Sequence, residues 1–201
     1  MIKNVVFDLG NVLISFKPSE YLSKSNYPPS LSNIILSDIF RSPEWLLLDD
    51  GKITTPEAIE AITRKSSLKY EEIARIFNER TKIFYSLDNN VRILPALKKQ
   101  GFKLYFISNF PADIFDDVKS NYDFFKYFDG GIISAEVKCS KPDKEIFRIF
   151  FEKYSLVPGE CFYIDDTEKN VIAAESFGMK GFITFGSADI LGDLNKLLTG
   201  L

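Results

Sequence analysis

Histidine is absent from all 201 residues of the chain. This absence excludes a Ser-His-Asp or Cys-His nucleophile, a histidine general base and a histidine-rich zinc site. The chemistry that remains open is that of carboxylates, hydroxyls and lysines.

Cysteine and long apolar runs are also scarce. Cys139 and Cys161 are too few for a disulfide framework, and no signal-peptide pattern opens the sequence, so we expect reduced thiols in the cytoplasm. The longest early apolar run, residues 5–16, is interrupted by polar residues and is too short to span a bilayer. We therefore expect a cytoplasmic protein without a membrane role.

An excess of positive charge is missing as well. The chain has 25 Lys and Arg against 28 Asp and Glu, a net charge of −3, with both signs interspersed. Generic nucleic-acid binding usually needs a basic face, so no nucleic-acid partner is expected. A small anionic metabolite is compatible with this balance, because a local site can be positive on an acidic protein.

The chain alternates short apolar runs with segments of helical period. The predicted strands are residues 2–8, 103–107, 131–134, 161–164 and 181–185. The predicted helices are residues 91–100, 112–120, 144–154, 169–177 and 189–198. Such alternation implies right-handed crossovers, so we predict a three-layer, Rossmann-like α/β core with a mostly parallel sheet.

Residues 15–87 break this alternation. Thr55-Pro56-Glu57 is a typical helix start, and Ile73, Ile76 and their neighbours gather on one side of a second helix. We predict a core of residues 1–14 and 88–201, with a small helical cap of residues 15–87 inserted after the first strand. The cap would lie over the carboxyl edge of the sheet, where open α/β sheets bind ligands.

Chemically active side chains follow the predicted strands. Asp8 ends the first strand, Ser108-Asn109 ends the second, Lys141 precedes a Pro-started helix, and Asp165-Asp166 follows the strand at 161–164. Each of these alone is also typical of an ordinary turn, helix cap or solvated lysine. The acid pair is the strongest signal, because adjacent carboxylates repel unless a cation or fixed donors compensate.

Taken together, these groups are what phosphoryl transfer to a carboxylate needs. Two carboxylates and a backbone carbonyl are hard oxygen ligands of the kind that Mg²⁺ prefers. A hydroxyl and backbone N–H groups can hold phosphate oxygens, and a lysine balances the negative charge. One carboxylate is then free to attack phosphorus.

The motifs FDLGN, ISN, KPDKEIF and IDDTEKNVIAAESFG occur in this order. With them the chain resembles the haloacid dehalogenase-like (HAD) superfamily from residue 8 to about residue 178, and the helical insertion resembles the cap of that superfamily. The first motif and LLDDGKITTPEAIEAI resemble a subgroup of small bacterial sugar phosphatases that also carries DLG. The resemblance implies a Mg²⁺-dependent phosphatase acting on a small phosphorylated metabolite such as a sugar phosphate.

The resemblance also implies roles for individual residues. Asp8 would be the nucleophile and a Mg²⁺ ligand, with the carbonyl of Gly10 as a second ligand, Asp166 as a direct ligand and Asp165 as a partner of metal-bound water.

The phosphate would be held by the Ser108 hydroxyl, the backbone N–H of Asn109 and Lys141. Lys141 would also hold Asp8, and Asn170 would orient the acid pair or Lys141.

One position departs from the pattern of the phosphatases. These enzymes usually carry a second Asp two residues after the nucleophile, which protonates the leaving oxygen, but this chain has Gly10. Losing a positioned acid typically costs about 10²- to 10⁴-fold in rate. One hypothesis is that Gly10 restricts the enzyme to substrates with a good leaving group, such as an anomeric sugar phosphate, an aryl phosphate or an acyl phosphate.

Two other functions stay open. A metal-independent haloacid dehalogenase would also lack the second Asp, although it has no use for Asp165 and Asp166. A slow or inactive binding or regulatory protein could keep the fold without the reaction. In each case substrate choice would belong to the cap, where Trp45, Asp49 and Asp50, together with Lys17, are candidates that packing or turn formation explains equally well.

Overall fold

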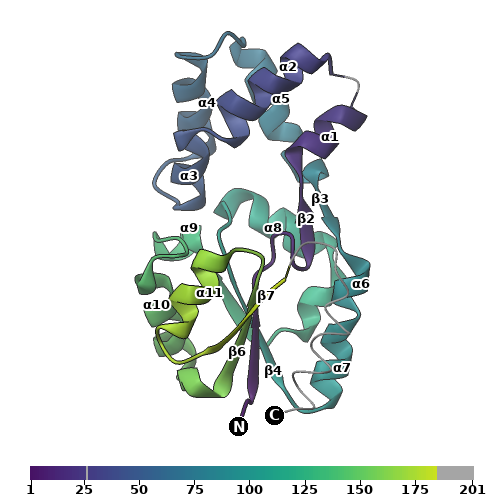
Figure 1. Ribbon diagram of the computed structural model, residues 1–201. Helices are drawn as coiled ribbons and strands as arrows, with labels where there is room; N and C mark the ends of the chain where they lie inside the picture. The colour runs from purple at the N-terminus through teal and green to yellow at the C-terminus, as the bar shows by residue number, and fades with distance from the viewer. Residues whose placement is uncertain (26, 185–201) are drawn as a thin grey trace.

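A five-stranded parallel sheet organises the computed structural model, which describes residues 1–25 and 27–184 (Figure 1). The strand order is β5-β4-β1-β6-β7. The strands are β1 (Asn4–Phe7), β4 (Lys103–Ser108), β5 (Gly130–Ile133), β6 (Cys161–Asp165) and β7 (Lys180–Ile183). The predicted Rossmann-like α/β core is confirmed, and its strands lie within about two residues of their predicted bounds.

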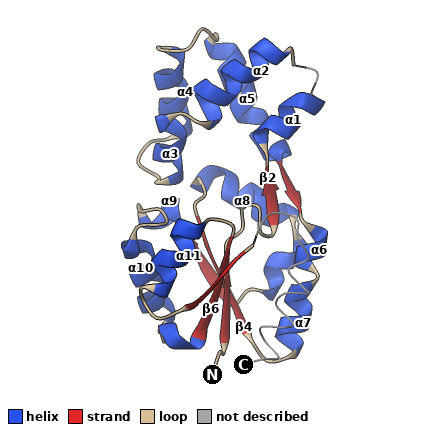
Figure 2. Cartoon of the chain, viewed as in Figure 1, coloured by secondary structure: helices blue, strands red, loops and turns tan. Residues whose placement is uncertain are grey.

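The central strand β1 is buried along its whole length because helices cover both faces of the sheet (Figure 2). Val5 and Phe7 point into one apolar cluster and Val6 into the other. A strand that is buried on both faces has no polar side, which is why its sequence reads as a continuous apolar run.

Helices form the two outer layers of this core. The first cluster is covered by α6 (Asp88–Val91), α7 (Ile93–Lys99), α8 (Ala112–Asn121) and the 3₁₀ turn Asp123–Tyr127. The second is covered by α10 (Lys144–Tyr154) and α11 (Glu168–Glu175), while α9 (Ser134–Val137) follows β5 and the 3₁₀ turn Pro158–Glu160 precedes β6. The predicted helix 189–198 and residue 185 of the last predicted strand lie outside the described residues.

The helices between residues 18 and 83 pack around a separate apolar cluster. They are α1 (Pro18–Lys24), α2 (Pro29–Ile35), the π-helix Leu36–Phe40, α3 (Pro43–Asp49), α4 (Thr55–Thr63), α5 (Tyr70–Glu79) and the 3₁₀ turn Arg80–Ile83. The N-cap of α4 is Thr54, whose side chain and that of Glu57 form a capping box. We refer to these helices as the cap.

A short antiparallel ribbon, which the sequence analysis did not predict, connects the cap to the core. Its strands are β2 (Ile14–Phe16) and β3 (Phe84–Ser86), so the chain enters and leaves the cap at neighbouring positions. A second tie is formed by Arg80, which donates hydrogen bonds to Thr55 in the cap and to Asp113 on α8. The cap therefore sits above the carboxyl edge of the sheet (Figure 1).

Two expectations about the chain as a whole can be compared with the structure. Cys139 and Cys161 are both free thiols. Within residues 1–25 and 27–184, no helix has the length and apolarity that crossing a membrane requires.

Candidate active site

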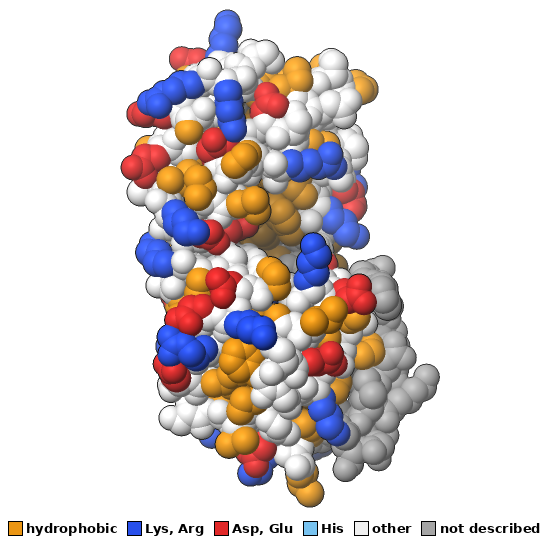
Figure 3. All heavy atoms as spheres, turned by 60° about the vertical axis from the view of Figure 1, so that its left-hand side comes forward, with side chains coloured by type: hydrophobic (Ala, Val, Ile, Leu, Met, Phe, Trp, Pro, Cys, Tyr) orange, Lys and Arg blue, Asp and Glu red, His pale blue; other side chains and the backbone are white. Residues whose placement is uncertain are grey.

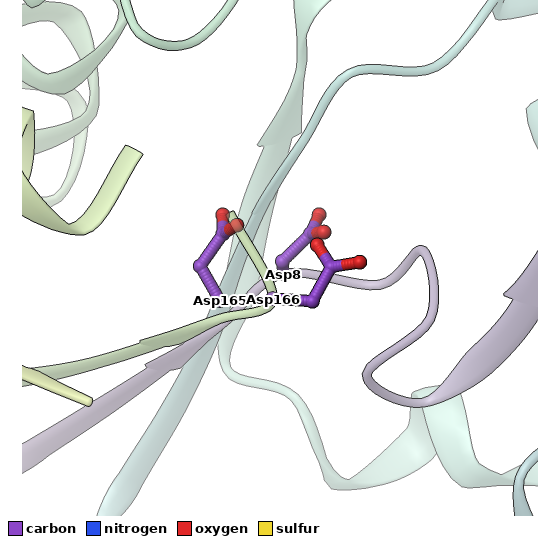
Figure 4. Close-up of side chains that lie close together, drawn as sticks. All are labelled: Asp8, Asp165 and Asp166. Carbon is purple, nitrogen blue, oxygen red and sulfur yellow. The ribbon is translucent and has the colours of Figure 1, made fainter. Parts of the chain in front are cut away.

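Three carboxylates meet at the carboxyl edge of the sheet. Asp8 directly follows β1, Asp165 is the last residue of the neighbouring strand β6, and Asp166 comes next. Each carboxylate offers an oxygen atom, and these atoms all lie within 4.8 Å of one another (Figure 4). Because neighbouring parallel strands end at the same edge, residues 157 positions apart in the sequence come into one cluster.

Lys141 places its ammonium group between two of these carboxylates. Its Nζ lies 2.8 Å from Oδ1 of Asp8 and 2.7 Å from Oδ2 of Asp165, and its side chain is 2% exposed. Asn109 fixes the backbone of Lys141: Asn109 Nδ2 donates to the Lys141 carbonyl at 3.0 Å, and the Lys141 N–H donates to Asn109 Oδ1 at 2.8 Å. The end of β4 thus positions the lysine.

Asp165 is the most completely paired of the three acids. Its Oδ2 accepts hydrogen bonds from Lys141 and from the hydroxyl of Tyr163 at 2.5 Å, and its Oδ1 accepts the N–H of Thr167 at 2.8 Å. The amide of Asn170 donates to both oxygens, at 3.0 and 3.1 Å. This fully buried carboxylate is stable because fixed donors replace the water it has lost.

Burial is the main influence on the pKa values of Asp8, Asp166 and Lys141, and neighbouring charges add to it or oppose it. Burial raises the pKa of Asp8 to about 7; Lys141 opposes this and the charge of Asp165 adds to it. Burial, and then the charge of Asp165, also raise the pKa of Asp166. Burial alone would lower the pKa of Lys141, but Asp8 and Asp165 together raise it, so this lysine carries its charge.

A divalent cation fits this arrangement. Three clustered carboxylates and one ammonium carry a net negative charge when all are ionised, and hard oxygen atoms suit Mg²⁺. Asp8 and Asp166 are the carboxylates with the fewest protein donors, since Asp165 is already saturated. Gly10, whose carbonyl is the third predicted ligand, lies in the tight loop that Asn11 turns with a φ of 53°.

The other predicted residues are at the same edge. Ser108 is buried at the end of β4, next to β1. Asn170 donates to Asp165 rather than to Lys141, which distinguishes between the two orienting roles considered for it. The structure therefore brings Asp8, Lys141, Asp165, Asp166 and Asn170 together, with Ser108 and Asn109 at the same sheet edge, and their catalytic roles remain predictions.

Two contributors were missed. Tyr163 is buried and donates its hydroxyl to Asp165, and its position two residues earlier on the same strand is the signal that could have revealed it. The side chain of Asn109, predicted to act through its backbone N–H, also holds the backbone of Lys141. No local pattern encodes that contact, since the two residues are 32 positions apart.

A cavity of about 90 Å³ adjoins this site between core and cap. It is lined by Gly10 and Asn109 from the core side, by the aromatic rings of Phe16, Trp45, Phe84 and Phe110, and by Pro111 and Asp49. Figure 3 shows hydrophobic side chains in a hollow between the two parts of the molecule. A group bound here would be beside the carboxylate cluster and largely in contact with apolar surface.

Known proteins share both the sequence pattern and the fold. A sesquiterpene phosphatase of Aspergillus oryzae is 28% identical over 196 residues, which cover 98% of this chain and 96% of the relative. A phosphorylated carbohydrates phosphatase of Thermotoga maritima is 27% identical over 203 residues, covering 96% and 89%.

Among solved structures, a HAD family enzyme of Bacteroides thetaiotaomicron, crystallised with magnesium and inorganic phosphate, is 24% identical. It covers 94% of this chain and 98% of its own, with a TM-score of 0.75. The fold is therefore the same, and the relatives of named activity above are phosphatases. The sequence matches the model of one family over residues 2–178, and with this match the predicted HAD-type enzyme is confirmed: the chain belongs to the haloacid dehalogenase-like hydrolases.

Proposed function

We propose that the protein is a Mg²⁺-dependent phosphohydrolase that cleaves a small phosphate monoester through an aspartyl-phosphate intermediate on Asp8. The observation that carries this proposal is the pairing of Asp8. Its side chain is 10% exposed, and among the described residues Lys141 is the one side chain that forms an ion pair with it. Such a carboxylate is held in place yet keeps an oxygen for attack on phosphorus.

The residues of this chain divide the work of the first step. An oxygen of Asp8 forms a bond to phosphorus while the bond from phosphorus to the leaving oxygen breaks. The hydroxyl of Ser108 and the N–H of Asn109 hold the non-bridging oxygens, and Lys141 neutralises charge on Asp8 and the phosphoryl group. The oxygen of a water molecule then forms a bond to phosphorus while the bond from phosphorus to Asp8 breaks, and inorganic phosphate leaves.

Mg²⁺, bound by Asp8, Asp166 and the Gly10 carbonyl, would supply charge neutralisation at the phosphoryl oxygens. Asp165 has a different task in this proposal. Because its oxygens accept hydrogen bonds from four groups, it fixes Lys141 rather than binding the metal directly. Of the adjacent acids Asp165 and Asp166, only Asp166 would therefore bind the metal directly.

The relatives support a phosphorylated small molecule as the substrate. The activities for which they are named concern a sesquiterpene and phosphorylated carbohydrates, so the substrates share a phosphate and differ in the group attached to it. The shared sheet edge would bind the phosphate, and the cavity under the cap would bind the attached group. A sugar phosphate is one candidate of this class.

Replacement of Asp8 tests the proposal. Asp8→Asn keeps the size of the side chain but removes the nucleophile, so hydrolysis of p-nitrophenyl phosphate in Mg²⁺ is expected to fall by at least about 10⁴-fold. The matched control is Asp117→Asn, which changes an exposed acid on α8 and should leave the rate unchanged. A rate in Asp8→Asn within tenfold of the unmodified protein would contradict the proposed nucleophile.

Chelation separates the two other candidate functions. EDTA should abolish phosphate release, whereas a dehalogenase would release halide from a 2-haloacid equally well in EDTA. A binding or regulatory protein would bind Mg²⁺ and phosphate in calorimetry but hydrolyse no ester of a broad panel.

A further inference from the structure

Within residues 1–25 and 27–184, the sheet edge of the candidate site offers no uncommitted proton donor for a leaving group. Gly10 stands where the related phosphatases usually have an acid, Asp165 is fully paired, and Lys141 is shared between two carboxylates. Asp8 and Asp166 are needed for attack and metal binding. If the leaving oxygen receives a proton, the donor must come from outside the sheet edge.

Asp49 of the cap lies at the same cavity. It is the last residue of α3, and it lines the cavity together with Gly10 and Asn109. Gly10, which stands where an acid is usual, and Asp49, an acid from the cap, thus line the same cavity. The cavity adjoins the phosphate end of the site, which is where the leaving oxygen of a bound ester would lie.

The turn that carries Asp49 is fastened to the core. The Ser134 hydroxyl donates to the Asp49 carbonyl, and Lys138 Nζ donates to the Gly51 carbonyl. Ser140 donates to the carboxylate of Asp50. Two core side chains therefore fix the backbone at Asp49 and Gly51, and a third holds the side chain of Asp50. The Asp49 carboxyl takes part in none of these three contacts.

Gly51 makes this close approach possible. Its φ is +59°, and a Cβ at this position would lie 2.4 Å from the carbonyl oxygen of Ala135. Any larger residue would have to shift the turn away from the core. The close contact between Gly51 and Ala135 thus fixes the turn against the core, and with it the backbone position of Asp49.

The surroundings of Asp49 suit a group that exchanges a proton. Among the described residues no side chain or backbone N–H donates a hydrogen bond to its carboxyl, whereas its neighbour Asp50 pairs with Lys52 and Ser140. Burial, and then the charge of Asp50, raise the pKa of Asp49 to about 7, so both its acid and its base form are accessible near neutral pH.

We propose that Asp49 is the general acid and base of the reaction, supplied by the cap in place of an acid at position 10. In the first step Asp8 forms its bond to phosphorus, the ester bond breaks, and the leaving oxygen takes the proton of Asp49 to become an alcohol. In the second step the Asp49 carboxylate removes a proton from the attacking water, phosphate leaves Asp8, and Asp49 is again an acid. This inference rests on the proposed function and replaces the hypothesis that Gly10 restricts the enzyme to activated esters.

The test compares leaving groups in single-turnover kinetics with phenyl phosphate and 2,4-dinitrophenyl phosphate. Phenolate needs a proton far more than dinitrophenolate does, so Asp49→Asn should slow phenyl phosphate by about 10²-fold or more and dinitrophenyl phosphate by less than about threefold. Both rates come from one preparation, so the folded fraction cancels in their ratio. The control is Asp117→Asn, which removes an exposed carboxyl on α8 that does not line the cavity and should leave both rates unchanged.

The outcomes separate the inference from the function on which it rests. If the unmodified protein hydrolyses both esters in an Asp8-dependent way but Asp49→Asn slows both equally, Asp49 is not the acid and only the inference falls. The unmodified protein gives a second measurement: an acid makes its two rates similar, and a strong dependence on the leaving group overturns the inference without any variant. If neither ester is hydrolysed, the proposed function fails and the inference fails with it.

Discussion

The carboxyl groups of Asp165 in the core and Asp49 in the cap have contrasting surroundings. Asp165 is fully buried and accepts hydrogen bonds from four groups. Asp49 is half-buried and accepts none within the described part of the chain. The comparison teaches that burial alone does not assign a role: a saturated carboxylate can only hold its neighbours, whereas an unpaired one can exchange a proton.

Removing the ammonium group of Lys141, which pairs with Asp165 in the core, should have the largest effect. Lys141→Met leaves Asp8 and Asp165 as buried acids without their shared ammonium. We expect a loss of about 3–5 kcal/mol in the free energy of unfolding in EDTA, and of about 10²- to 10³-fold in phosphate hydrolysis with Mg²⁺. Urea denaturation and initial rates measure the two losses.

The control for this variant is Lys169→Met, an equally long but exposed lysine on α11. It should change neither quantity measurably. If Lys141→Met is as stable in EDTA as the unmodified protein, the buried carboxylates of Asp8 and Asp165 do not need the lysine. The contrast between a paired Asp165 and an unpaired Asp49 would then be wrong.

A smaller change tests whether Asp165 needs all of its hydrogen-bond donors. Tyr163→Phe keeps the ring and removes one donor from the buried carboxylate of Asp165, so the free energy of unfolding should fall by about 1–3 kcal/mol. Tyr105→Phe on β4 is the matched control, because no hydrogen bond of that buried tyrosine is found within the described residues, and it should cost less than about 0.5 kcal/mol. Equal losses of unfolding free energy in the two variants would show that the hydroxyl of Tyr163 does not stabilise the carboxylate of Asp165.

The smallest effect is expected from Asp49 in the cap, and it concerns how the free energy of unfolding depends on pH. The pKa of Asp49 rises from an ordinary 3.8 to about 7, so the folded protein keeps a proton that the unfolded chain releases. This stabilisation is complete below about pH 4 and is lost as the pH rises toward 7. Asp49→Asn should therefore flatten the decline in the free energy of unfolding between pH 4 and 7 in EDTA.

The expected flattening is about 1 kcal/mol, allowing for the partial exposure of the carboxyl. Urea titrations at several pH values measure it, with the exposed Asp117→Asn variant as the reference. A steeper decline in Asp49→Asn than in the reference would mean that Asp49 is ionised in the folded protein throughout this range.

Sequence patterns predicted the core better than the contacts that connect its parts. The helix 144–154 has the bounds that the sequence predicted, because its apolar positions recur with helical period and Asp143 caps its start. The acids at the ends of β1 and β6 were evident from the apolar strands before them. The ribbon of β2 and β3 was missed, since each strand has three residues and their pairing joins segments about 70 positions apart.

The same reason explains what was missed at the candidate site. Asp49 appeared in the sequence as one of several cap residues that turn formation explains equally well. Its environment depends on Ser134, Lys138 and Ser140, which lie some 85 to 90 positions away and follow β5. Hydrogen bonds over such separations leave no local period in the sequence.

The ribbon of β2 and β3 has a consequence for how such an enzyme diversifies. Because the chain crosses to the cap and back at two adjacent, hydrogen-bonded strands, everything between them can be exchanged as one module without rerouting a single strand of the sheet. A transplanted cap would bring Asp49 with it. Recognition of the leaving group and its protonation would then be inherited together, while the phosphate chemistry stays with the recipient.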